Sequence, residues 1–294
     1  MSGLPRKSQE LIVIVSFMFI PVLLLLVFSY YPAVTLIYNS LTSWSGLGPK
    51  PWIGLKNYIQ LFSDPGYFKI LLNNFAYFII GYVEIFLALY FAVLLNMKFK
   101  GRNFFKTLIF LPYIINSIAV AFMMTFVFDN SYGAINVFLR QIGLGNIAPN
   151  WVGNSTLVNY TFAFMSLWKY LGMTTVLFLA ALQSIGSDIY EAAGLDGANA
   201  WQTFWNITLP GIWGMFQLTL FMNLSGAIGA FEFVFAIYPA GSPMGMADTF
   251  VIKTINTAFK FHNFGMASAM GVVLMAFTGV MVLAQFKLFN RGGD

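Results

Sequence analysis

The chain has 294 residues, of which 59% are hydrophobic and only 9% are charged, and its mean hydropathy is +0.76. A soluble globular chain carries about 25% charged residues, so most of this chain must be surrounded by lipid. The formal net charge of +5 comes from basic residues that are dispersed at the ends of apolar runs. They are not gathered into one stripe, and this distribution argues against nucleic-acid binding. The chain contains no cysteine, so disulfides are excluded.

Long apolar runs predict that the chain crosses the membrane as helices. About 20 apolar residues are needed to cross a hydrocarbon core of about 30 Å, and a helix satisfies every backbone polar group internally. Runs such as LLLLVF are apolar on every side and lack the alternation of β-barrel strands. We therefore expect an all-α membrane protein, with one transmembrane domain over residues 1–294. Six predicted spans cover residues 11–30, 70–95, 107–128, 157–182, 212–238 and 264–286.

The first apolar run follows Arg6 and Lys7, as in a secretion signal, but it is too long for one and no small-residue cleavage site follows it. We expect it to be retained. A cytoplasmic N-terminus gives the inner segments about twice the density of basic residues found in the outer segments, so the positive-inside rule predicts that both termini are cytoplasmic. The inner basic residues are then Arg6, Lys7, Lys98, Lys100, Arg102, Lys106, Lys287 and Arg291.

The predicted cytoplasmic loop over residues 183–211 contains three acidic residues and no basic residue. Its first half places apolar residues at helical intervals as far as Leu195, and the pair Asp196-Gly197 is a common turn signal. A second helical stretch is expected to end near Ile207, and Pro210 stands where its missing N–H is harmless, at the start of a helix. From composition alone, this loop could simply connect two spans as an interfacial helix.

The same loop resembles the EAA signature of bacterial ABC importer permeases, with both of its characteristic spacings. The matching residues are Glu191, Ala192, Ala193, Gly197, Ile207, Leu209 and Pro210. The strings WIGLKNYIQLF, FLP, SLWK and AALQSI extend the resemblance to permeases of the maltose and glycerol-phosphate type. The chain departs from that pattern at PAGSP, residues 239–243, where the family usually has a glycine-glycine-proline turn.

The resemblance implies a type I ABC importer permease fold and a transport subunit that is not an enzyme. It implies a heterodimer with a second homologous permease, two ATPase subunits that use ATP and magnesium, and an extracytoplasmic sugar-binding protein, all in the inner membrane of a bacterium. The seven signature residues would then form a coupling helix and its supports against an ATPase. No Walker motif is present, so we expect this chain itself to bind no cofactor.

Charged residues within predicted spans are costly in lipid and usually face a polar interior; here they are Glu84, Lys169 and Glu232. The resemblance places four residues of the fourth span toward the sugar, whereas Lys169 could equally form an ion pair with Glu84 or Glu232. Polar residues of the fifth span are further candidates, because a lipid-facing amide is costly. The expected substrate-binding residues are Ser166, Lys169, Tyr170, Met173, Asn223, Ser225, Phe231 and Glu232.

Other classes of membrane protein remain alternatives. An ion-coupled secondary sugar transporter would need intramembrane carboxylates and symmetry-related halves, and only Glu84 and Glu232 are available. A membrane-embedded enzyme would need catalytic side chains, and the sequence offers few. The single histidine, His262, has neither an acidic cluster nor a second histidine near it in sequence, and the same observation predicts no metal site. The sequence does not identify the sugar, and a disaccharide, an oligosaccharide or glycerol phosphate bound through Lys169 all fit.

Overall fold

The structure is a computed structural model that describes residues 6–239 and 241–289. Those residues are helical apart from loops and one isolated bridge between Thr42 and Trp52. The chain forms two compact units: the first contains the residues up to Asp64 together with Thr257–Met275, and the second contains Pro65–Asn256 and the residues from Ala276 on. The predicted all-α class is confirmed.

The first unit begins with a helix that is longer than the sequence predicted. The helix α1 (Arg6–Leu25) continues through a π-helical turn, η1 (Leu26–Tyr30), into α2 (Tyr31–Ser40), ten residues beyond the expected end of the span. Pro32 does not stop it, because a proline is tolerated in the first turn after the wider π turn. The helix α3 (Lys56–Ser63) follows.

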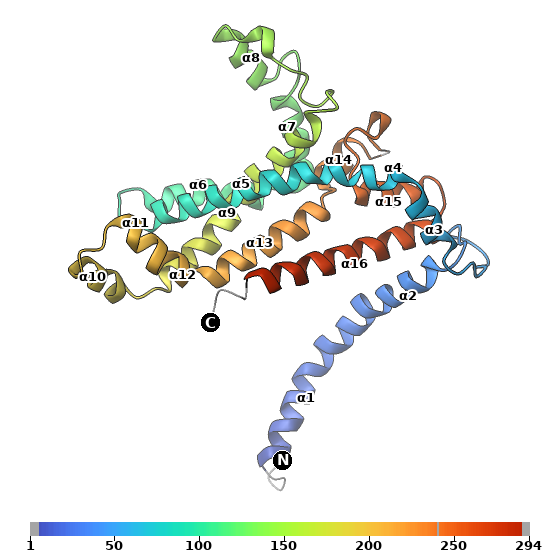
Figure 1. The fold of residues 1–294 in the computed structure, drawn as a ribbon, viewed down its shortest axis with the longest axis horizontal. Helices are drawn as coiled ribbons and strands as arrows, with labels where there is room; N and C mark the ends of the chain where they lie inside the picture. Colours follow the sequence, from blue (N-terminus) through green and yellow to red (C-terminus); the bar gives the residue numbers. More distant parts are fainter. Residues whose placement is uncertain (1–5, 240, 290–294) are drawn as a thin grey trace. The chain divides into compact units, whose positions relative to one another are not determined.

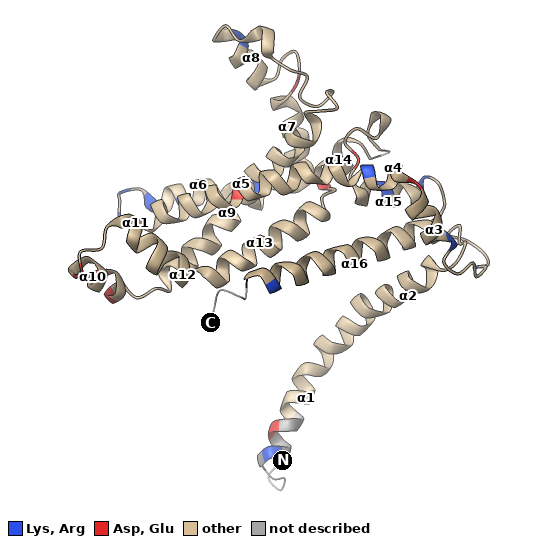
Figure 2. Ribbon diagram, viewed as in Figure 1, with Lys and Arg blue, Asp and Glu red and all other residues tan. Residues whose placement is uncertain are grey.

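The second unit is built from long apolar helices that lie side by side around α9. The helix α9 contacts α5, α6 and α13, and α5 also contacts α13 (Figure 1). Charged residues are sparse along these helices and more frequent in the loops that join them (Figure 2). The long helices of this unit are α5 (Leu71–Asn96), α6 (Arg102–Ile114), α7 (Ser117–Val127), α9 (Val158–Gln183) and α13 (Trp213–Ile228).

Shorter helices complete the chain between and after these spans. In Figure 1, α8 follows α7, and α14 and α15 follow α13. The final long helix, α16 (Phe264–Phe289), belongs to the first unit as far as Met275 and to the second from there on. Four of these short helices are α4 (Pro65–Lys69), α8 (Ala134–Gln141), α14 (Glu232–Ile237) and α15 (Phe250–Phe259).

The predicted third span is sharply broken. The axes of α6 and α7 differ by 101°, and the break lies at Ile115 and Asn116, whose backbones are extended. Pro112 lacks the N–H that a regular helix needs, and the side chain of Asn116 accepts a hydrogen bond from the Ile118 N–H, which starts the new helix. Continuous hydropathy over residues 107–128 could not reveal this bend.

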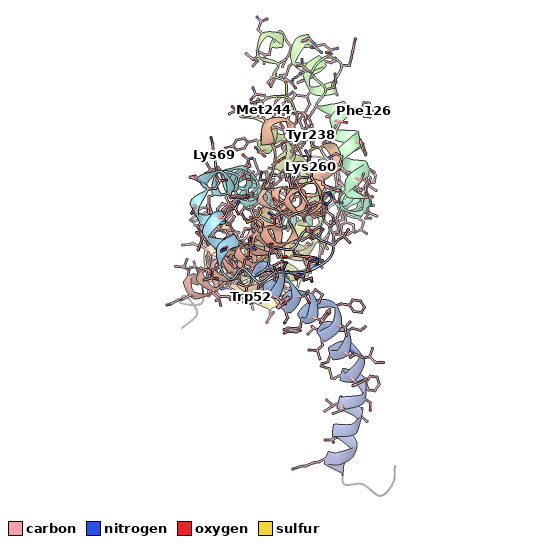
Figure 3. All side chains as sticks on the ribbon, turned by 90° about the vertical axis from the view of Figure 1, so that its right-hand side faces the viewer. Trp52, Lys69, Phe126, Tyr238, Met244 and Lys260 are labelled. Atoms are coloured by element: carbon pink, nitrogen blue, oxygen red, sulfur yellow. The ribbon has the colours of Figure 1, made fainter. Side chains whose placement is uncertain are left out.

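Five helices of the described chain are long and apolar enough to cross a membrane, and the bent pair α6–α7 gives a sixth if it forms one span. The predicted fifth span is also interrupted, between Gly229 and Phe231, where α13 gives way to α14. Large apolar side chains project outward, as expected for helices in lipid: Phe126 of α7 is 78% exposed (Figure 3). The predicted inner residue Arg291 and part of the departure at 239–243, Ala240, lie outside the described residues.

The buried apolar side chains of the second unit form two clusters. One surrounds Phe162 and Met165 of α9, and the other surrounds Phe178 of the same helix and Ile85 of α5. Both ends of α9 are therefore anchored by fully buried side chains. This arrangement fixes the middle of α9, which carries the predicted substrate residues, against its neighbours.

Candidate functional site

A cavity of about 310 Å³ lies in the second unit, at the middle of α9 and next to the break between α13 and α14. Its volume is at the low end of the range of about 300–1,000 Å³ for small-molecule pockets. Its walls come from α5, α6, α9, α13 and α14. The residues that line it include Tyr77, Gly81, Glu84, Tyr113, Ser166, Tyr170, Met173, Thr174, Asn223, Phe231 and Glu232.

One face of α9 supplies the largest polar part of this wall. Ser166, Tyr170, Met173 and Thr174 all line the cavity, and their spacing of three and four residues puts them on one side of a helix. The Ser166 hydroxyl donates to the Phe162 carbonyl at 3.2 Å, so it is satisfied within the helix. The hydroxyls of Tyr170 and Thr174 point to other helices.

Each of the two lining carboxylates accepts a hydrogen bond from α9. The Thr174 hydroxyl donates to Glu84 Oε1 at 2.7 Å, and the Tyr170 hydroxyl donates to Glu232 Oε2 at 3.0 Å. Glu84 is only 9% exposed, so this bond offsets part of the cost of a buried carboxylate. A carboxylate oxygen can accept more than one hydrogen bond, so both carboxylates can also accept from a ligand hydroxyl.

Two further polar atoms of lining residues are buried and have no partner among residues 6–239 and 241–289. They are the Asn223 Oδ1 and the Tyr77 hydroxyl. Buried polar atoms are normally hydrogen-bonded, and leaving one unpaired costs about 1–3 kcal/mol. Asn223 is held against Gly81 of α5, since a Cβ at that glycine would lie 1.7 Å from Asn223 Nδ2. Both atoms belong to lining side chains but are covered by neighbouring atoms, so each could bond to a hydroxylated ligand only after its side chain moves.

Lys169, predicted as a substrate-binding residue, does not line this cavity. It is 4% exposed, and its Nζ donates to the main-chain carbonyls of Ile115 at 2.6 Å and Tyr113 at 3.3 Å. The predicted ion pair with Glu84 or Glu232 does not form in the described structure, because these carbonyls take the ammonium group instead. Lys169 therefore binds the broken third span.

Six of the eight predicted substrate residues line the cavity, and Lys169 and Ser225 do not. Ser225 is half-buried in α13, where its carbonyl accepts from the Gly229 N–H at the end of the helix. Sequence reasoning missed Thr174, although it lies four residues after Tyr170 on the same face. It also missed Tyr77 and Tyr113, whose roles depend on contacts between helices that no local pattern shows.

The predicted coupling loop has the helix and the turn expected from its sequence. The helix α10 (Ser187–Leu195) exposes Glu191 and Ala192 and buries Ala193. Gly197 follows with φ of +78°, a left-handed conformation that favours glycine. Leu195, at the end of α10, is 90% exposed. The loop thus presents a short helix with an apolar tip and an acidic side chain to its surroundings.

The second half of the loop is braced against α10. Asn199 and Gln202 form a reciprocal capping box at the start of α11 (Ala200–Thr203). A π-helical turn, η3 (Phe204–Thr208), leads to α12 (Leu209–Gly211), and the Tyr190 and Thr208 hydroxyls lie 3.2 Å apart, which joins the two halves. The predicted residues Ile207 and Leu209 are half-buried here, and Pro210 stands in the first turn of α12.

Residues 84–292 match the family model described as a binding-protein-dependent transport system inner membrane component. The chain belongs to this family. The matched region covers the coupling loop and the cavity helices from Glu84 of α5 onward, so the resemblance first seen in the EAA residues is confirmed over most of the chain. This permease is accordingly a multi-pass membrane subunit of an ABC importer and not an enzyme.

Curated relatives and solved structures agree with this assignment. The permease is 34% identical to a probable ABC transporter permease, YurN, of Bacillus subtilis, over 94% of this chain and 95% of that protein. It is 31% identical to the multiple sugar-binding transport system permease MsmF of Streptococcus mutans, over 94% of each. A subunit of a bacterial ABC transporter for the import of alginate has the same fold, with a TM-score of 0.83 over 98% of this chain and 99% of that one, at 22% identity.

Proposed function

We propose that this permease moves a neutral di- or oligosaccharide across the membrane through the cavity beside α9. The observation that supports this most directly is the lining, which combines two carboxylates, unpaired amide and phenol oxygens, and aromatic side chains. Relatives named for multiple sugars, diacetylchitobiose, starch degradation products and arabinooligosaccharides point to the same class of ligand. The proposed ligand-binding residues are Ser166, Tyr170, Met173, Asn223, Phe231 and Glu232.

The charge of the cavity argues for a neutral sugar. Glu84 and Glu232 are its charged lining residues, and no lysine or arginine occurs among the residues of the described chain that line it. Carboxylate oxygens accept hydrogen bonds from sugar hydroxyls, whereas they repel phosphate or uronate groups. Because the Lys169 ammonium is bound to main-chain carbonyls, glycerol phosphate loses the cation through which it could have been held.

The proposed assembly contains a second homologous permease, two ATPase subunits that use ATP and magnesium, and an extracytoplasmic binding protein. A solved bacterial alginate ABC transporter of the same fold was captured with a ligand-bound periplasmic protein, which supports this arrangement. We place both termini and α10 in the cytoplasm, with Glu191, Ala192, Ala193 and Gly197 against an ATPase and Ile207, Leu209 and Pro210 supporting them. Closure of the ATPase pair would then move the spans between inward-facing and outward-facing states.

Reconstitution tests the proposal against an ion-coupled secondary transporter. The complete importer in proteoliposomes is given a panel of neutral oligosaccharides, uronate oligosaccharides and glycerol phosphate, and uptake and ATP hydrolysis are measured together. We expect a neutral sugar to stimulate hydrolysis and to enter only with ATP and the binding protein. Uptake by this chain alone down an ion gradient would contradict the proposal, and preferential uptake of an anionic sugar would refute the proposed charge selection.

A further inference from the structure

Lys169 is the one intramembrane charge that the proposed cavity does not use. It belongs to the middle of α9, yet its Nζ lies outside the lining and is directed to the end of α6. An ammonium group buried in a membrane-spanning helix is costly unless it is paired. Its partners are two carbonyls at the break of the third span, so its function must be sought there.

The break leaves main-chain groups that need partners. The last carbonyls of a helix have no partner within the helix, and they carry the negative end of its dipole. At α6 these include the carbonyl of Tyr113, and Ile115 follows as the first extended residue. Lys169 satisfies both carbonyls with charge-assisted hydrogen bonds, which are stronger than neutral ones. On the other side of the break, Asn116 caps α7 through the Ile118 N–H.

The same contacts fix an aromatic part of the cavity wall. Tyr113 lines the cavity, and its ring lies edge-on to that of Tyr170, with centroids 6.1 Å apart. The Lys169 Nζ lies 5.8 Å from the centroid of the Tyr113 ring and 5.5 Å from that of Tyr170, within the range of cation–π attraction. One ammonium group therefore touches the backbone of the break and both rings.

We propose that Lys169 is a positioning residue that caps the end of α6 from the neighbouring helix α9, holds the bend of the third span, and thereby sets Tyr113 and Tyr170 in the wall of the cavity. It does not touch the transported ligand. The proposal rests on the proposed function only for the statement that this wall binds sugar. The geometric part, that the ammonium group holds the bend, stands independently.

The bend can be measured directly because the chain contains no native cysteine. Leu108 of α6 and Phe122 of α7 are 52% and 54% exposed, so Leu108→Cys with Phe122→Cys gives a spin-label pair across the break. Distances are compared in the complete importer carrying Lys169, Lys169→Arg or Lys169→Met. Lys56→Met, which changes an exposed lysine of α3, is the matched control.

We expect Lys169→Met to broaden or shift the distance distribution and to lower sugar uptake at least about tenfold, since two half-buried carbonyls at the break lose their donor. Lys169→Arg keeps the charge and the donors, so it should restore the distribution and most of the uptake. An unchanged distribution with Lys169→Met would overturn the proposal, and lost uptake with an unchanged distribution would assign Lys169 to the ligand. If the bend responds to Lys169→Met but Asn223→Ala and Glu232→Gln leave uptake intact, the positioning role stands and the proposed sugar cavity fails.

Discussion

Gly81 of α5 and Asn223 of α13 meet so closely that a Cβ at position 81 would lie 1.7 Å from the Asn223 Nδ2. The three nearest atoms that this Cβ would meet on another helix all belong to the end of the Asn223 side chain. The Asn223 amide can therefore occupy this position in the cavity wall only because residue 81 is a glycine. The contact also connects the two helices that face α9 at this level.

Gly81→Ala should reorient Asn223 without preventing folding, because a flexible side chain can yield where backbone cannot. We expect a rise of about threefold to tenfold in the sugar concentration for half-maximal uptake, corresponding to one altered hydrogen bond. Asn223→Ala should have a similar effect, and the double variant should be no worse than Asn223→Ala alone. Gly214→Ala, where a Cβ meets nothing within 4 Å, is the control. Additive effects would show that Gly81 acts independently of Asn223.

Gly172→Ala should damage the fold itself. A Cβ at this position of α9 would lie 2.1 Å from the Ile109 carbonyl oxygen and 2.7 Å from the Phe110 Cα, both backbone atoms of α6. The two helices must then separate, and we expect a loss of roughly 2–3 kcal/mol or more in stability. Thermal denaturation in detergent measures it, again with Gly214→Ala as the control. An unchanged melting temperature would mean that α6 and α9 are not this close in the assembled protein.

The membrane-spanning helices of this fold could be predicted from the sequence more readily than the breaks within them. Unbroken apolar runs are a direct consequence of lipid as solvent, so the helical class and the positions of most spans followed from hydropathy. The break at Ile115 and Asn116 depends instead on Pro112, an Asn cap and a lysine 54 residues away in sequence. Residues 107–128 remain strongly apolar despite the proline and the asparagine, so their hydropathy does not reveal a bend.

The candidate site divides in the same way. The helical face of Ser166, Tyr170 and Met173 follows from spacing alone, and the resemblance directed attention to it. Lys169 lies between them in sequence, but its long side chain reaches past the cavity to the carbonyls of another helix. A charged residue in a membrane span is expected to have a structural or functional role, but the sequence does not show which neighbouring group it binds.

Removing the hydroxyl of Tyr170 should impair transport through Glu232. Tyr170→Phe removes the hydroxyl that donates to the half-buried Glu232 carboxylate at 3.0 Å. The loss of a hydrogen bond to a charged group costs about 1.5–3 kcal/mol. We expect uptake to fall by about tenfold or more. Tyr160→Phe, on an exposed part of the same helix, is the matched control and should transport normally. Equal uptake by the two variants would place the sugar elsewhere.

The coupling loop offers a pair of glycines that differ in one respect. A Cβ at Gly194 or Gly197 meets nothing within 4 Å, but only Gly197 has a positive φ, +78°. Alanine at position 197 should therefore strain the turn by about 1–2 kcal/mol, whereas alanine at position 194 suits the helix α10. We expect Gly197→Ala to lower sugar-stimulated ATP hydrolysis and uptake together, and Gly194→Ala to preserve both.

Charge reversal at Glu191 tests the same loop from the side of its partner. Glu191 is exposed on α10 and does not line the cavity, so Glu191→Arg should leave sugar binding unaffected. It should weaken docking to the ATPase, because the new arginine repels a basic residue there or the ion pair of Glu191 with that residue is lost. Copurification of the ATPase and stimulated hydrolysis should both fall, with Asp188→Arg at the start of α10 as a comparison for charge alone. If importers that carry either variant show normal ATP hydrolysis and sugar uptake, α10 is a connecting helix and the ATPase must dock elsewhere on the permease.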